Sequence, residues 1–263
     1  MSGSHLISPD WPAPSCVSAV ITTREGGVSQ EPWASWNLAG HVGDRPEAVA
    51  ENRRRLQEAL ALPHPPQWLE QIHGTSIVEA SVVDAGLAEA GAAGRVLTAD
   101  GCHTRQPGLA CAVLTADCLP VLFCNKKGTH VAAVHAGWRG LAKGILASAV
   151  ARFQEPSAEL MAYLGPALSQ PHFEVGVEVL EAFFESARNE VHNEAIASAF
   201  QPGGRPLHFQ ADLFALARAE LAALGVTSVY GGHECTFIDK ARFYSYRRDG
   251  TTGRMASLIW INP

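Results

Sequence analysis

The chain has 263 residues, of which 47% are hydrophobic and 17% charged, so it can bury a sizeable core and has the composition of an ordinary globular protein. Its formal net charge of −6 argues against nucleic acid as a partner, because the phosphate backbone must be neutralised by Lys and Arg. No membrane span is expected, since the apolar segment 109–123 is short and contains Asp117. The N-terminal residues lack the pattern of a secretory signal, and a cytoplasmic location is therefore predicted.

The pattern of apolar runs and turn residues predicts a mixture of strands and helices. Residues 1–15 are expected to be irregular, Asp44 to cap the first helix, and Gly225 to close the last one. In chain order the sequence predicts strand 17–23, helix 46–62, an extended region 67–83, strands 109–115, 119–124 and 129–135, helices 141–153, 175–188 and 211–224, and strands 226–231, 242–248 and 256–261. This order has no strict βαβ rhythm, which favours an α+β (α/β) fold: one domain, 1–263, with mixed, largely antiparallel sheets flanked by helices.

Six cysteines occur, and none forms a CxxC pair, so ribbon and finger zinc sites are not expected. In a reducing compartment such thiols are structural, catalytic or metal-bound rather than paired in disulfides. Cys111 and Cys124 lie within predicted strands and are expected to pack in the sheet.

The central hairpin singles out one cysteine and one histidine. If residues 125–128 form a four-residue loop, residue 124 faces 129 and Cys118 faces His135 directly. Facing residues have Cβ atoms about 4.5–5.5 Å apart, a gap that a metal with bonds of roughly 2.0–2.3 Å can bridge. Pro120 could interrupt the ladder, and a bulge would shift the register by one residue. Alone, each of the two residues has the ordinary interpretation of a buried core side chain.

His73 is the natural third ligand, because Gly74 follows it and allows a close backbone approach. Three protein ligands and an open fourth position are typical of catalytic rather than structural zinc. Sequence alone does not bring His73 near Cys118. The other candidate histidines are interpreted as surface residues: His103, His130 and His172.

Arginine residues near glycine-rich turns are candidates for binding an anion. Arg139 lies in the turn 137–140, which leads into a predicted helix whose first N–H groups lack partners. A solvated surface side chain is the alternative interpretation. Arg24 and the pair Arg247 and Arg248 are weaker candidates of the same kind.

At these residues the chain resembles the YfiH-type family, whose members carry the names polyphenol oxidase or laccase, purine nucleoside phosphorylase and peptidoglycan editing factor. The matching stretches are 23–29, 37–38, 42–44, 51–53, 71–74, 115–120, 134–140, 165–167, 173–176 and 245–250. Two departures occur: Phe173 stands where a Tyr is expected, and a second Cys after Cys235 is absent. The resemblance implies that His73, Cys118 and His135 are zinc ligands.

The resemblance further implies a zinc-dependent purine nucleoside phosphorylase that cleaves adenosine, inosine or methylthioadenosine with phosphate, as a monomer or homodimer. It also implies adenosine deaminase activity, for which zinc-activated water at C6 of adenine is reasonable chemistry. Arg139 and Arg24 are then the candidates for binding phosphate.

Three alternatives stay open. The first is a metal-free cysteine hydrolase that edits peptidoglycan precursors, with Cys118 as nucleophile and His135 as base. The second is a copper-dependent polyphenol oxidase (laccase), disfavoured because the 11 histidines include no His-x-His pair, although Cu²⁺ could bind the same residues. The third is a binding module with a purely structural metal, which would need a fourth protein ligand.

Overall fold

The most apolar strands of the chain pair with each other at the centre of the fold. In the computed structural model, which describes residues 5–89 and 96–263, β8 (Leu119–Asn125) pairs antiparallel with β9 (Val131–Ala136), and every residue of both strands is buried. Strands covered on both faces carry apolar residues throughout instead of alternating. The pair forms the middle of a six-stranded sheet with the order β14 (Ser228–Gly231), β10 (Leu160–Leu164), β8, β9, β6 (Gly101–Thr104) and β4 (Ile77–Glu79).

A second sheet lies against one face of the first. Its strands are antiparallel, in the order β1 (Leu6–Ile7), β2 (Val17–Thr22), β15 (Met255–Ile261) and β7 (Cys111–Thr115). Side chains of the two sheets meet in one buried cluster, in which Val113 of β7 joins Leu122 of β8. The outer face of the second sheet is covered by α1 (Pro46–Ala59), whose Leu56 shares a cluster with Trp260.

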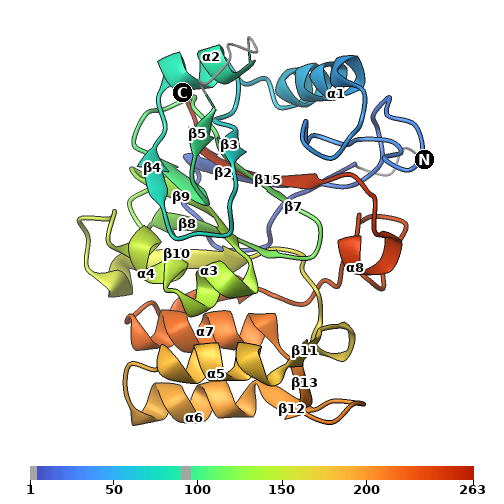
Figure 1. Cartoon of the computed structure of the whole chain (residues 1–263). Coiled ribbons are helices and arrows are strands. Elements are labelled where there is room, and N and C mark those ends of the chain that lie inside the picture. The colour runs from blue at the N-terminus through green and yellow to red at the C-terminus, as the bar shows by residue number, and fades with distance from the viewer. Residues whose placement is uncertain (1–4, 90–95) are drawn as a thin grey trace.

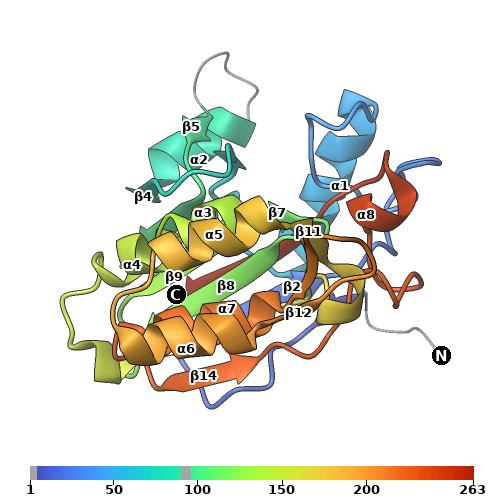
Figure 2. The same ribbon diagram turned by 60° about the horizontal axis from the view of Figure 1, so that its bottom comes forward.

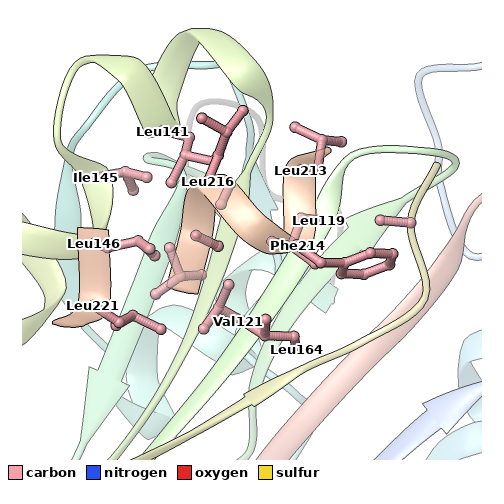
Figure 3. Close-up of a cluster of buried hydrophobic side chains, with 14 of the residues drawn as sticks. Leu119, Val121, Leu141, Ile145, Leu146, Leu164, Leu213, Phe214, Leu216 and Leu221 are labelled. Atoms are coloured by element: carbon pink, nitrogen blue, oxygen red, sulfur yellow. The ribbon is translucent and has the colours of Figure 1, made fainter. Parts of the chain in front are cut away.

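Helices cover the other face of the six-stranded sheet (Figures 1 and 2). Figure 3 shows Leu141, Ile145 and Leu146 packed with Leu216 over the side chain of Val121. The helices of this layer are α3 (Trp138–Ala142), α4 (Ile145–Val150), α5 (Val177–Glu185), α6 (Glu190–Ser198) and α7 (Leu213–Ala223). The smaller elements are the sheet β11 (Glu174–Gly176), β13 (His208–Ala211) and β12 (Phe200–Pro202), the pair β3 (Leu69–Glu70) and β5 (Leu97–Thr98), the helices α2 (Val82–Glu89) and α8 (Tyr246–Asp249), and the 3₁₀ turns η1 (Ser157–Glu159) and η2 (Gln170–His172).

The predicted class, a single α+β domain with mixed and largely antiparallel sheets, is confirmed. Within the described ranges, no helix is long and apolar enough to cross a membrane.

Several predicted elements differ from the structure at points where a local backbone signal was missed. The predicted helix 141–153 is two helices, because Gly144 adopts a left-handed φ of 86° between them. The segment 242–248 is not a strand: the Ser245 hydroxyl accepts the Arg248 N–H and starts α8. The extended region 67–83 ends early, since the Ser81 hydroxyl accepts the Asp84 N–H and α2 begins there.

Other corrections concern the first half of the chain and the segment before α6. Within the N-terminal segment expected to be irregular, Leu6 and Ile7 form the edge strand β1. Asp44 does not cap α1; its buried carboxylate accepts hydrogen bonds from the Ser29 hydroxyl and the Asn37 amide. The helix predicted over 175–188 ends at Glu185, and α6 begins five residues later with the Asn189 side chain as its cap.

The hairpin register differs from the prediction by two residues. Asn125 stays in the ladder opposite His130, because its side-chain oxygen accepts the N–H groups of Thr129 and His130. The loop is therefore 126–129, and Pro120 rather than Cys118 lies opposite His135. A shift by an even number of residues leaves every side chain on its original face. The two candidate ligands consequently stay on the same side of the hairpin, in diagonal rather than direct opposition.

His103 and His130, both expected at the surface, form a buried pair instead. Their Nδ1 and Nε2 atoms are 3.0 Å apart, and the His130 ring lies against Phe153 at a centroid distance of 4.1 Å. Burial, reinforced by the positive charge of Arg105, lowers the pKa of His130 to about 4. Burial also lowers the pKa of His103. The pair is therefore neutral in the folded protein at neutral pH.

Because the pKa values of this histidine pair are lowered, we expect the protein to lose stability in mild acid. A histidine with a depressed pKa binds its proton only in the unfolded chain between about pH 6.5 and 4, so the free energy of unfolding falls as the pH drops through that window. Thermal melts across this range should show the decrease, and His130→Gln should flatten it. The control His233→Gln, at an exposed position, should keep the wild-type slope. An unchanged slope in His130→Gln would assign the acid sensitivity to other groups.

Candidate metal centre

Three side chains from separate parts of the sequence converge at one end of the central hairpin. Cys118 immediately precedes β8, His135 is the second-last residue of β9, and His73 lies in the loop between β3 and β4. One ligand atom from each lies within 4.8 Å of the others, and Cys118 Sγ is 4.0 Å from His73 Nε2. His135 is buried, Cys118 is half-buried and His73 is exposed, so the group opens toward solvent on the His73 side.

Asp100 holds two of these three residues, His73 and His135, in place through hydrogen bonds. It is fully buried just before β6, and its carboxylate accepts the N–H groups of His73 at 2.8 Å and Gly74 at 2.6 Å. The same carboxylate faces His135 Nδ1 at 2.9 Å, and the Asp100 carbonyl accepts the His135 N–H. With Nδ1 engaged in this way, Nε2 is the His135 atom left for a ligand. His73 itself has a left-handed φ of 59°, which the hydrogen bonds to Asp100 hold in place.

Charge interactions favour ionised forms in this cluster. Burial alone would raise the pKa of Asp100, but the hydrogen bonds from His135 and Gly74 lower it. Burial would likewise raise the pKa of Cys118, but the positive charge of His135 and its hydrogen bond bring that pKa down to about 6. For His135, burial is outweighed by Cys118 and Asp100, which raise its pKa to about 9. A thiolate is thus favoured at neutral pH, the form that binds metals.

Gly137 allows the three side chains to approach one another. It follows β9, and a Cβ placed there would lie 3.1 Å from both Cys118 Sγ and His73 Cδ2. Gly140 has a related role, because its Cβ would lie 2.8 Å from the Gly74 carbonyl. The two glycines of the turn 137–140 therefore allow the turn to pack directly against the loop that carries His73.

Asp117 fixes the backbone before Cys118. Its φ of 99° is unusual for a residue with a side chain, and the structure stabilises it on three sides. The carboxylate accepts the Thr236 hydroxyl and the Arg247 N–H, each at 2.6 Å, and the carbonyl accepts the Leu168 N–H. Asp117 thereby connects the cysteine to the start of α8.

The cluster lies in a cavity of about 560 Å³. Its wall includes Gln71, whose side chain is fixed by two hydrogen bonds to the Leu114 backbone. The remaining lining residues share no single chemistry: His41, His73, Leu114, Thr115, Ala116, Asp117, Cys118, His135, Trp138, Arg139, Leu168, Phe173, Tyr246, Arg247 and Arg254. A cavity of this size with aromatic walls and several cations is suited to small-molecule ligands, of which at least one is an anion.

The predicted anion-binding arginines separate into two groups. Arg139 lines the cavity, and its guanidinium lies over the Trp138 ring at 4.4 Å. Arg24 is not among the lining residues; its guanidinium donates to the carbonyls of Ala34 and Lys240. Of the pair near the C-terminus, Arg247 lines the cavity, whereas Arg248 donates to three backbone carbonyls in 236–243.

The sequence reasoning did not single out Asp100, Gln71, His41 or Arg254. Asp100 had one usable signal, an acidic residue in the short apolar stretch 96–102. Its partners lie 27 and 35 residues away, across strand pairings that the sequence does not reveal.

The donor set fits a metal ion. A tetrahedral ion with bonds of about 2.3 Å to sulfur and 2.0–2.1 Å to nitrogen places those atoms about 3.5 Å apart, so slight side-chain movement closes the observed group around it. Among the described residues the group has three members, and the cavity adjoins it. The cluster could therefore hold a metal with one position left for solvent or substrate.

Comparison with known proteins places this chain in a family. The chain belongs to the family described as multi-copper polyphenol oxidoreductase laccase, which matches residues 18–262. It is 52% identical to purine nucleoside phosphorylase PA4543 of Pseudomonas aeruginosa over 97% of this chain and 98% of that one. It is 48% identical to purine nucleoside phosphorylase YfiH of Escherichia coli, over 98% and 99%. The crystal structure of Neisseria meningitidis protein NMB0706 is 49% identical and superimposes with a TM-score of 0.88, covering 99% of this chain and 100% of that one.

The relatives' names support the status of this chain as an enzyme with a purine nucleoside phosphorylase-like function. The similarity to the Neisseria structure also supports the mixed α/β fold over the whole chain.

Asp100→Asn tests the support beneath the cluster. The amide places a donor where the carboxylate now accepts backbone N–H groups, so we expect a lower melting temperature and metal affinity weakened about 10- to 100-fold. Competition with a chromogenic chelator measures the affinity. The exposed Asp10→Asn is the matched control and should behave as wild type. Unchanged affinity in Asp100→Asn would mean that its hydrogen bonds do not orient the cluster.

Proposed function

We propose that this protein is a zinc-dependent purine nucleoside phosphorylase that cleaves adenosine, inosine or methylthioadenosine with phosphate. The observation that carries the proposal is the convergence of His73, Cys118 and His135 at a cavity that leaves one metal position open. The names of the relatives support the reaction class. Deamination of adenosine at the same centre belongs to the proposal as a second activity.

In phosphorolysis, a phosphate oxygen bonds to C1′ of the ribose while the bond from C1′ to the purine nitrogen breaks. The electron pair leaves with the purine, which takes up a proton. Zinc, when bound, would supply a Lewis acid beside the substrate. The cavity arginines Arg139, Arg247 and Arg254 offer positive charge to the phosphate, and Trp138 and Phe173 offer ring surfaces for the purine.

The metal ligands in this proposal are the three residues of the cluster, and Asp100 keeps His135 oriented by its hydrogen bond at Nδ1. Thiolate and imidazole are soft or borderline donors, and both suit zinc. Copper also binds such donors, so a copper-dependent oxidase stays as an alternative associated with the family description.

A metal-free cysteine hydrolase is the second candidate, and one observation favours it. The pKa of Cys118 is lowered to about 6 beside His135, as in a nucleophile activated by a base. The two proposals differ in what happens when metal is removed. The phosphorylase loses activity on chelation, whereas the hydrolase keeps it and is instead blocked by a thiol-directed electrophile.

Cys118→Ala tests the phosphorylase proposal. Wild-type protein should contain about one zinc per chain and, with phosphate, convert adenosine to adenine and ribose 1-phosphate. The variant should lose metal and activity but keep its fold, because Cys118 lies at the rim of the core rather than within it. Atomic absorption, product chromatography and circular dichroism measure the three properties. The exposed Cys16→Ala is the matched control.

Two results would count against this proposal. Wild-type protein that yields no phosphate-dependent product from any of the three nucleosides would remove the phosphorylase function. An unfolded Cys118→Ala protein would indicate a structural metal.

Arg139→Ala tests the phosphate contact proposed from the turn 137–140. Among the described residues Arg139 has no ion-pair partner, and its guanidinium is available at the cavity wall. We expect the KM for phosphate to rise about tenfold, the loss typical of one charge-assisted hydrogen bond, while deamination is spared because it needs no phosphate. Steady-state kinetics at varied phosphate measure this, with exposed Arg55→Ala as control. Equal losses in both reactions would remove Arg139 from the phosphate site.

A further inference from the structure

A second cation, Arg254, lines the same cavity and has unused hydrogen-bonding capacity. It lies directly before β15 and is half-buried. Its Nη1 donates to the carbonyls of Thr252 at 2.9 Å and Gly253 at 3.0 Å. For Nε and Nη2, the described part of the chain provides no hydrogen-bond acceptor. Burial lowers the pKa of Arg254, which reflects a partly dehydrated guanidinium. A cation that has already lost water binds an anion more strongly than an exposed one.

The segment that carries His41 is tied to Arg254 through Asn37. The Asn37 side-chain oxygen accepts the Arg254 N–H at 3.0 Å, and its amide donates to Asp44 at 2.9 Å. The Leu38 N–H also donates to the Arg254 carbonyl. These buried contacts fix both ends of the stretch between Asn37 and Asp44, and His41 in its middle lines the same cavity as Arg254.

The electrostatics around His41 indicate a positive field. Desolvation lowers its pKa first, followed by the positive charges of Arg254 and Arg53, with Glu70 opposing. An anion bound between Arg254 and His41 would relieve this repulsion.

The other two arginines of the cavity are exposed, so water can satisfy their donors. The Arg247 guanidinium donates to the Glu174 carbonyl, and that of Arg139 stacks on Trp138, much as that of Arg254 lies over Tyr246 at 5.9 Å. The one carboxylate in the wall, Asp117, is already satisfied by Thr236 and the Arg247 N–H. Arg254 is therefore the arginine of the wall whose unused donors are partly shielded from water.

We propose that Arg254 and His41 form the subsite that binds inorganic phosphate, with the Arg254 Nε and Nη2 groups as its principal donors. The identity of the anion rests on the phosphorylase function proposed above. Arg139 contributes a further charge, but the half-buried Arg254 contributes the larger share of phosphate binding.

Three variants and one control test the subsite. Arg254→Gln removes the charge at similar size, Arg254→Lys keeps it without the two-pronged donor geometry, and His41→Gln keeps a polar side chain. Arg55→Gln, on the exposed side of α1, removes a charge outside the cavity. Kinetics of the zinc-loaded enzyme give the KM for phosphate and for adenosine separately. Calorimetric titration with inorganic phosphate alone gives binding without turnover.

Arg254→Gln should raise the KM for phosphate and weaken phosphate binding by about tenfold or more, with a smaller change in the KM for adenosine. The effect should exceed that of Arg139→Ala, Arg254→Lys should recover part of it, and His41→Gln should weaken phosphate binding severalfold. Melting curves and bound zinc should match wild type. If folded, zinc-loaded Arg254→Gln binds phosphate as wild type does, the subsite is wrong. An equal rise in both KM values would also overturn it, because it would indicate a general distortion of the cavity.

The two proposals fail separately. If the wild-type enzyme shows no phosphorolysis yet binds phosphate through Arg254, the proposed function fails and the anion site stands. If phosphorolysis is normal and insensitive to Arg254, the function stands and the subsite fails. If Arg254→Gln does not fold, Arg254→Lys and His41→Gln decide by the same two measurements.

Discussion

The arrangement of the metal centre depends on one buried carboxylate. Asp100 accepts backbone N–H groups from the loop that carries His73 and a ring N–H from His135. A buried carboxylate is costly unless its oxygens are hydrogen-bonded, and here each oxygen has at least one donor. The loop 72–74 and strand β9 are thus fixed against a common point, and the distance between the two imidazoles follows from it. The two rings also contact each other edge to face, with centroids 4.8 Å apart.

The central sheet could be predicted from the sequence because its residues are apolar on both faces. The strands ending at Thr115, Asn125 and Ala136 lie close to where their composition suggested. Their register could not be predicted, since it depends on the side chain of Asn125, which binds the loop backbone and shifts the pairing partner of each residue by two. Short helices were missed where a serine cap acted without a long apolar stripe, as at Ser81 and Ser245.

The candidate ligands could be selected from their side-chain chemistry, but their proximity in space could not be inferred from their separation along the chain. Cys118, His135 and His73 could be selected because thiol and imidazole next to glycine-rich turns are unusual, and the structure brings the three together. Asp100 and Arg254 are neither thiols nor imidazoles, and His41 was not singled out although it lies between Gly40 and Gly43. Arg254 lies beside the cavity through contacts distant in sequence, among them the hydrogen bond from its N–H to Asn37, 217 residues away. The cytoplasmic location and the oligomeric state stay predictions.

The proposed function requires the centre and the cavity wall to bind two dissimilar substrates. A purine nucleoside is neutral and offers a flat apolar surface, whereas phosphate carries up to two charges that must be balanced before it leaves water. The thiolate of Cys118 and the carboxylate of Asp100 are negative, and His135 with its raised pKa balances one of these charges. A metal ion bound there would add the positive charge that makes the inner end of the cavity favourable to an anion. The arginines of the wall would offer phosphate a second region of positive charge. In the proposed function the metal and the arginines are therefore complementary, because each would offset part of the cost of taking phosphate out of water.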